Sequence, residues 1–121
     1  MKIGILPCQG TSNTGVMTTK AAMHFVGKDD VGMVCPLGLP LGIEGIIKQA
    51  LSNDAHIALN GCPIKCASKA LQSIGVTDFD EMTLTSDFNI QKNKDFSDET
   101  GLFEVIEALG KTISNIQANQ H

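Results

Sequence analysis

Residues 2–26, KIGILPCQGTSNTGVMTTKAAMHFV, contain the pattern from which the architecture can be predicted. A short apolar run over residues 2–7 ends at a proline, and a loop of small and polar residues follows over residues 8–15. Residues 16–26 then place apolar side chains at helical spacing. The segment therefore predicts a strand, a loop and a helix in that order.

The same order of elements recurs along the rest of the chain. Strands that alternate with helices predict βαβ units, whose right-handed crossovers produce a parallel sheet. We therefore predict the α/β class: a small parallel sheet of about four strands with helices on both faces, flavodoxin-like or Rossmann-like. A single domain over residues 1–121 accommodates all the segments. The other predicted strands are residues 31–35, 56–60 and 81–86, and the other predicted helices are residues 43–53, 63–75 and 102–116.

Composition limits the partners that the protein is expected to have. The 121 residues carry a formal net charge of −4 and include no arginine, which argues against nucleic acid, because phosphate recognition relies on basic, often forked donors. Gly, Pro or charged residues interrupt every apolar stretch well before the roughly 18 residues of a membrane span. The opening residues MKIGILPC are too short for a signal peptide. We therefore expect a cytoplasmic protein with no membrane partner.

The four cysteines are the most informative residues for function. Cys8, Cys35 and Cys62 lie 27 residues apart, each at or just after the end of a predicted strand. Because parallel strands align their carboxyl ends, we expect these thiols to meet at one edge of the sheet, where open α/β sheets bind ligands. With Cys62 as the N-cap of the third helix, Cys66 would share a helix face with it, with Cβ atoms about 5–6 Å apart.

This arrangement predicts one zinc ion bound by four thiolates. Thiols of a cytoplasmic protein stay reduced, and cysteines four apart on a helix suit chelation better than a disulfide. The predicted ligands are Cys8, Cys35, Cys62 and Cys66, and the metal would serve in metal handling or in structure.

Two alternatives remain open from the residues alone. One is a thiol-dependent or zinc-dependent enzyme in which Cys62 acts as the nucleophile or as an open-site ligand. The other is an iron–sulfur cluster bound to the same thiolates. We favour binding over catalysis, because no His, Asp or Glu is convincingly placed as a general acid or base.

At LNGCPIKCA, residues 59–67, with a lone cysteine after each of the first two strands, the chain resembles the DGC-domain family of zinc-binding proteins. The resemblance runs nearly end to end and implies four chelating cysteines, without implying a particular reaction. The central Asp-Gly-Cys of the family is Asn60-Gly61-Cys62 here. Asn60 retains a carbonyl acceptor but lacks the negative charge. It can therefore replace an Asp that hydrogen-bonds the backbone, but not one that acts as a base or metal ligand. By the same resemblance, the chelating residues are Cys8, Cys35, Cys62 and Cys66.

Two loops give weaker signals. GTSNTG, residues 10–15, suits either anion binding or simple capping of the helix that follows, and we favour capping. The polar segment after the fourth strand resembles a lysine-rich segment of the family and places Lys92 and Lys94 in a loop. In an enzyme, residues 86–97 would form a lid over the crevice. The lack of arginine argues against a phosphatase-type cysteine loop, and the lack of C-x-x-C argues against thioredoxin-like exchange.

Overall fold

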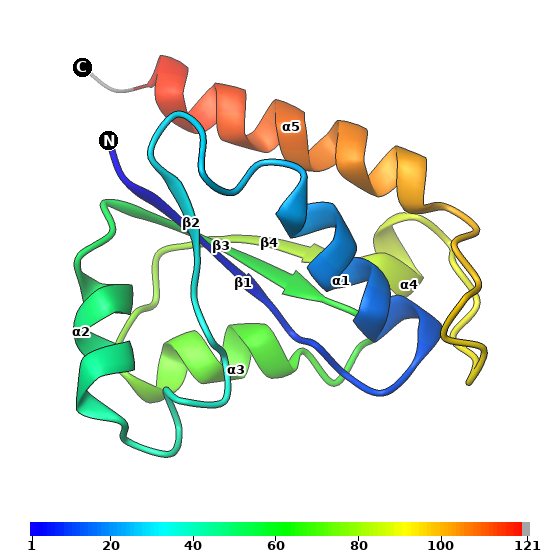
Figure 1. The fold of residues 1–121 in the computed structure, drawn as a ribbon, viewed down its shortest axis with the longest axis horizontal. Coiled ribbons are helices and arrows are strands. Elements are labelled where there is room, and N and C mark those ends of the chain that lie inside the picture. The colour runs from blue at the N-terminus through cyan, green and yellow to red at the C-terminus, as the bar shows by residue number, and fades with distance from the viewer. Residues whose placement is uncertain (120–121) are drawn as a thin grey trace.

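The computed structural model describes residues 1–119, so the last two residues of the predicted domain lie outside the described part. Strands and helices alternate along the chain, and the predicted α/β class is confirmed (Figure 1). The elements are β1 (Ile3–Pro7), α1 (Asn13–Met23), β2 (Val31–Met33), α2 (Glu44–Leu51), β3 (Ala55–Asn60), α3 (Cys66–Ser73), β4 (Asp80–Thr83), α4 (Leu84–Asp87) and α5 (Leu102–Ala118).

The four strands form one parallel sheet in the order β2-β1-β3-β4. The chain moves outward from β1 to β2 and then returns across β1 to β3, so the direction of winding changes between β1 and β3. This is the strand order of flavodoxin-like folds, in which ligands bind beyond the carboxyl ends of the strands at the point of reversal. The functional site is therefore expected between the connections that follow β1 and β3.

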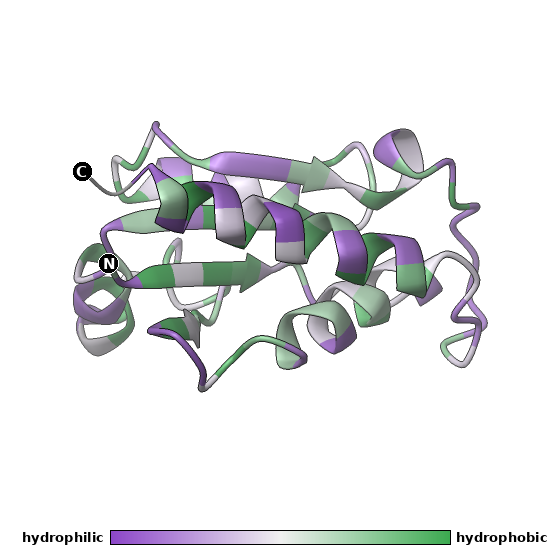
Figure 2. Cartoon of the chain, turned by 90° about the horizontal axis from the view of Figure 1, so that it is seen from above, coloured by the Kyte–Doolittle hydropathy of each residue, from purple (hydrophilic) through white to green (hydrophobic). Residues whose placement is uncertain are grey.

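Helices cover both faces of the sheet, as predicted, because side chains alternate between its two faces. Ile3 and Ile5 of β1 pack in a core with α1 and α5, whereas Leu6 packs in a second core with α2 and α3. Figure 1 shows α1 and α5 on one side of the strands and α2 and α3 on the other. In Figure 2, β1 is apolar along most of its length, as expected for a strand covered on both faces.

Several element boundaries differ from the prediction for identifiable reasons. Helix α1 begins at Asn13, because the hydroxyl of Ser12 accepts a hydrogen bond from the N–H of Gly15 at 3.0 Å and caps the helix. The loop over residues 10–15 thus supplies the capping that we favoured. At the other edge, β4 ends at Thr83, whose N–H donates to the Asp87 carboxylate at 2.7 Å, and residues 84–87 form the short helix α4.

The start of the third helix was predicted wrongly. Helix α3 begins at Cys66, so Cys62 is not its N-cap and the two cysteines do not share a helix face. Residues 62–65 form a turn in which the N–H of Lys65 donates to the carbonyl of Cys62 at 3.1 Å. Lys65 itself has a left-handed φ of 58°, which a helix cannot continue through.

Among the residues that the structure describes, no helix combines the length and apolar character needed to cross a bilayer.

Candidate site at the carboxyl edge of the sheet

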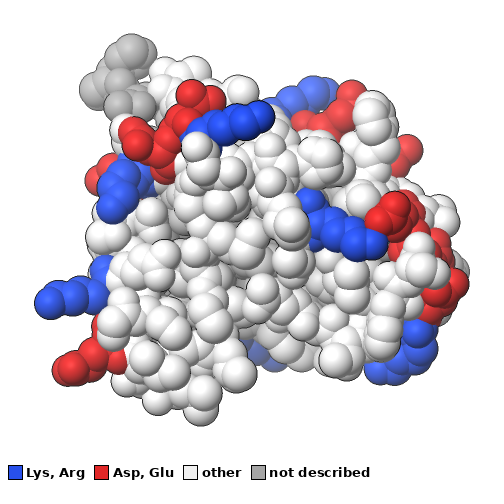
Figure 3. Space-filling view, viewed as in Figure 1, with Lys and Arg blue, Asp and Glu red and all other residues white. Residues whose placement is uncertain are grey.

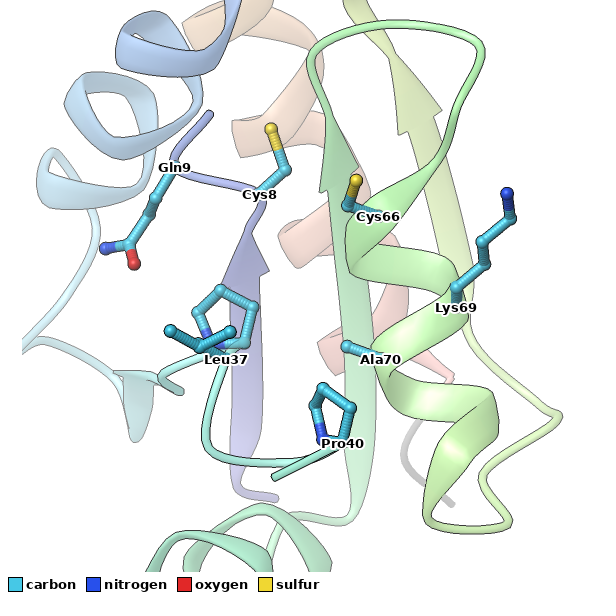
Figure 4. Close-up of a pocket in the computed structure, with 8 residues that line it drawn as sticks. Cys8, Gln9, Leu37, Pro40, Cys66, Lys69 and Ala70 are labelled. Carbon is cyan, nitrogen blue, oxygen red and sulfur yellow. The ribbon is translucent and has the colours of Figure 1, made fainter. Parts of the chain in front are cut away.

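A cavity of about 490 Å³ lies at the point where the winding reverses. Its walls come from the connection after β1, the connection after β2 and the first turns of α3 (Figure 4). Cys8 and Cys66 both border it, and Figure 4 shows their side chains on the same side of the cavity, pointing the same way. The fold thus brings together two of the four predicted site residues. The lining residues are Cys8, Gln9, Pro36, Leu37, Pro40, Cys66, Lys69 and Ala70.

Cys8 is fixed to β3 by its main chain and to the connection after β3 by its sulfur. Its N–H donates to the carbonyl of Leu59 at 2.9 Å, which extends the pairing of β1 with β3 by one residue. Its half-buried Sγ lies 3.3 Å from the N–H of Gly61 and accepts a hydrogen bond from it. The position of this thiol is therefore set by the Asn-Gly-Cys segment, 53 residues away in sequence.

Gly61 lies where the main chain after β3 packs closely against the start of α1. A Cβ atom at this position would lie 3.0 Å from the N of Gly15 and 3.2 Å from the hydroxyl of Thr14. The start of α1 thus packs directly against the main chain after β3. A side chain at this position would require the two connections to move apart by a few tenths of an ångström.

Both cysteines at the cavity adjoin a residue with strained backbone. Gln9, which follows Cys8, has φ 57°, and Lys65, which precedes Cys66, has φ 58°. Neither residue is glycine, and the left-handed conformation costs a residue with a side chain about 1–2 kcal/mol. The surrounding contacts must offset this cost, so the directions of the two thiols are determined by tertiary structure.

Asn60 supplies the missing cap of α3 from the end of β3. Its fully buried side chain accepts hydrogen bonds through Oδ1 from the N–H groups of Ala67 and Ser68, at 3.0 and 3.2 Å. Its Nδ2 donates to the hydroxyl of Ser68 at 2.8 Å. The position that is Asp in the family name therefore hydrogen-bonds backbone amides here, and an asparagine carbonyl serves that role.

Glu81 of β4 connects this cap to the turn between the cysteines. One carboxylate oxygen accepts a hydrogen bond from the Ser68 hydroxyl at 2.6 Å, and the other pairs with the ammonium group of Lys65 at 2.7 Å. The hydrogen bond from Lys65, reinforced by that from Ser68, holds the pKa of Glu81 below its ordinary value. The same contact raises the pKa of Lys65.

Replacing Glu81 with Gln is expected to change the acid sensitivity of the fold. The pKa of Glu81 is lower in the folded state than in the unfolded state. The carboxylate therefore contributes its full stabilisation of the fold above the unfolded-state pKa, and this stabilisation is lost as the pH falls through the folded-state pKa. Glu81→Gln should therefore lower the free energy of unfolding at pH 7 by about 1 kcal/mol or less, as for other partly exposed ion pairs, and its difference from the wild type should be smaller at pH 3. Urea denaturation at both pH values measures this difference. An equal loss at both pH values would contradict it.

Cys62 faces a different set of residues. Its half-buried Sγ lies 3.5 Å from the ammonium group of Lys92, which belongs to the segment between α4 and α5. That segment is attached to the start of α1, since Asn93 N–H donates to Asn13 Oδ1 at 2.6 Å and Lys94 Nζ donates to the carbonyl of Thr11 at 2.9 Å. The predicted loop with its two lysines thus packs at the carboxyl edge of the sheet. These contacts join residues about 80 apart in the sequence, so no local sequence pattern predicts them.

The cysteines fit zinc by type, but the structure does not gather all four. Cys35 is exposed and lies beyond the end of β2, outside the cavity lining. Within residues 1–119, no three His, Cys, Asp or Glu side chains lie close enough together to hold one ion. Four free thiols are suitable donors for zinc, yet the arrangement found here is not a closed tetrahedral site.

These features define a small flavodoxin-like α/β protein with a cysteine-bordered cavity at the point where its sheet reverses direction. The comparison with protein families identifies it further: the family model described as DGC domain matches residues 4–112. The chain therefore belongs to the DGC domain family, in agreement with the resemblance noted in its sequence. Comparisons with curated proteins and with solved structures gave no match.

Proposed function

We propose that this protein binds one zinc ion through its four cysteines. The observation that supports the proposal is their common origin in connections at the carboxyl ends of three adjacent strands, in the order β2-β1-β3. Cys8 and Cys66 already border one cavity, and thiolates are preferred ligands of zinc. The proposed ligands are Cys8, Cys35, Cys62 and Cys66.

Binding would require the connections to move, because in the part of the chain that the structure describes the cysteine sulfur atoms do not lie close enough together to hold one ion. The turn that carries Cys62 is suited to this, since the residues after it, Pro63 and Ile64, are exposed and carry no core packing. Cys35 is likewise exposed, beyond the last residue of β2. We therefore propose that ion binding is coupled to closure of these connections, and that it stabilises the folded state by that coupling.

A second candidate function is thiol chemistry at Cys62. It is favoured by one specific contact, the ammonium group of Lys92 at 3.5 Å from Cys62 Sγ. A cation beside a sulfur is the usual environment of a reactive cysteine. Under this alternative, Lys92 would orient the thiol, and the segment between α4 and α5 would cover it.

Anaerobic titration of the reduced, metal-free protein with Co²⁺ tests the first function against the second. Co²⁺ reports on zinc sites, because tetrahedral thiolate coordination produces strong charge-transfer absorption. We expect one equivalent of Co²⁺ to saturate this absorption and Zn²⁺ to displace it. Absorption without thiolate bands, combined with rapid alkylation of Cys62 that slows in Lys92→Gln, would overturn zinc binding in favour of thiol chemistry.

A further inference from the structure

We propose that oxidation joins Cys62 and Lys92 by a reversible sulfur–nitrogen bond, which makes this pair a redox-modification site. The bond needs no metal, so the site goes beyond the zinc binding proposed above. Its basis is the contact of 3.5 Å between Cys62 Sγ and the ammonium group of Lys92, residues that lie 30 apart in the sequence. A cysteine oxidised to sulfenic acid condenses with a thiol or a nitrogen beside it, and here the neighbour is a nitrogen.

The main chain on both sides of Lys92 is held in place by Asn13 at the start of α1. Asn13 Nδ2 donates to the carbonyl of Gln91 at 2.8 Å, and Asn13 Oδ1 accepts a hydrogen bond from the N–H of Asn93 at 2.6 Å. Asn13 is fully buried, and satisfied polar contacts in a buried position rigidify the segments that they join. Lys92 lies between two anchored residues, so the fold itself presents its side chain to Cys62.

Lys92 has no carboxylate partner that would hold it away from the sulfur. Within residues 1–119 it forms no ion pair, whereas Lys20 and Lys65 each pair with a glutamate. Lys94, two residues further on, donates to a backbone carbonyl at 2.9 Å. In the described part of the chain, the hydrogen-bond partner of the Lys92 side chain is therefore Cys62 Sγ.

A small oxidant can reach this pair of residues. Cys62 is half-buried and Lys92 is exposed. Figure 3 shows charged side chains along the right-hand border of the molecule, where Figure 1 draws the segment between α4 and α5. The segment thus lies at the surface. A partly exposed sulfur beside a cation is the environment in which cysteines are oxidised most readily.

The bond forms in two balanced steps with hydrogen peroxide as the oxidant. The Cys62 sulfur attacks one peroxide oxygen and becomes sulfenic acid, while the other oxygen leaves as water, so the sulfur loses the two electrons that the peroxide gains. The Lys92 nitrogen then attacks the sulfur. The sulfenic hydroxyl leaves as water with one proton from the ammonium group, and a second proton passes to solvent. A thiol reductant cleaves the product and restores both side chains.

The crosslink also has a consequence for the metal, which rests on the proposed function. Cys62 is one of the proposed zinc ligands, and a sulfur bonded to nitrogen is no longer a thiolate donor. The link would also tie the turn after β3 to the segment between α4 and α5. Oxidation would therefore release the ion until a thiol reductant restores the ligand.

Peptide mapping of the full chain tests the crosslink. The reduced protein is kept metal-free with a chelator, so failure of zinc binding would leave the result unchanged. After treatment with hydrogen peroxide, free thiols are blocked with iodoacetamide and the protein is digested with trypsin, which separates Cys62 from the other cysteines. We expect residues 49–65 joined to residues 70–94, because a modified Lys92 resists cleavage, with a mass lower than the sum by two hydrogen atoms. Dithiothreitol added before digestion should abolish this product.

Two lysine variants and dimedone, which traps sulfenic acid, make the test specific. Lys92→Gln should abolish the linked peptide and raise dimedone labelling of Cys62 about fivefold or more, because the sulfenic acid loses its partner. Lys94→Gln, at the neighbouring lysine, should keep both the link and the low labelling. A link to Lys94, a disulfide between Cys62 and another cysteine, equal dimedone labelling in the wild type and Lys92→Gln, or no linked peptide would each overturn the proposal.

Discussion

Asn60→Ala is expected to lower the free energy of unfolding by about 3–4 kcal/mol. The substitution leaves the N–H groups of Ala67 and Ser68 without their acceptor and removes the donor to the Ser68 hydroxyl, all in a buried position. A buried polar group that loses its partner costs about 1–3 kcal/mol, and loss of a helix cap contributes about 1 kcal/mol. Urea denaturation monitored by circular dichroism measures the change.

Two further variants distinguish the cap from general damage to α3. Ser73→Ala removes a single hydroxyl contact, to the carbonyl of Ala70 at the other end of the helix, and should cost about 0.5 kcal/mol or less. Asn60→Asp keeps both acceptor contacts but loses the donation to Ser68, whose hydroxyl would then lie between two carboxylates, that of residue 60 and Glu81. The loss of unfolding free energy in Asn60→Asp should therefore lie between the losses in Asn60→Ala and Ser73→Ala. A loss below about 1 kcal/mol in Asn60→Ala would contradict the capping role.

Cys66→Ser is expected to weaken zinc binding more than about 100-fold. Residues that only support a metal ligand typically contribute 10–100-fold to affinity, so removal of a ligand should exceed that range. Because Cys66 is exposed, the free energy of unfolding of the variant, measured without metal, should lie within about 0.5 kcal/mol of the wild-type value. Competition with a chromophoric zinc chelator measures the affinity.

The same assay applied to Cys35 tests the number of ligands. Cys35→Ser should also weaken binding strongly if four thiolates hold the ion, although this residue lies outside the cavity lining. Ser73→Ala on α3 is the control and should leave affinity unchanged. If either Cys35→Ser or Cys66→Ser retained wild-type affinity, the four-cysteine proposal would be wrong.

Hydrophobic periodicity was sufficient to predict the class of fold and the position of the site. Runs such as Ile3 to Leu6 are apolar throughout, because a parallel strand is covered on both faces, and each is followed by a helix with one apolar stripe. Alignment of parallel strand ends then predicted that Cys8, Cys35 and Cys62 follow strands at one edge of the sheet, whereas Cys66 was placed there through a helix start that was wrong. These inferences rest on short-range patterns and on one topological rule.

The details of the site could not be predicted in the same way, because they depend on distant contacts. Lys65 is an ordinary lysine whose left-handed backbone and pairing with Glu81 are set by tertiary structure. The cap of α3 comes from Asn60, six residues before the helix starts, beyond the reach of local capping patterns. Pro63 suggested an earlier start, since proline favours the first helical turn, but the chain uses it within a turn.

Metal content of the protein purified anaerobically without added metal tests the central proposal most directly. Zinc, iron and copper per chain are determined together with reactive thiols before and after chelation. We predict one zinc per chain and few reactive thiols until the chelator is added, after which four should titrate. A preparation with no bound metal and four thiols that titrate at once would contradict zinc binding, and a brown preparation with iron would replace zinc by an iron–sulfur cluster.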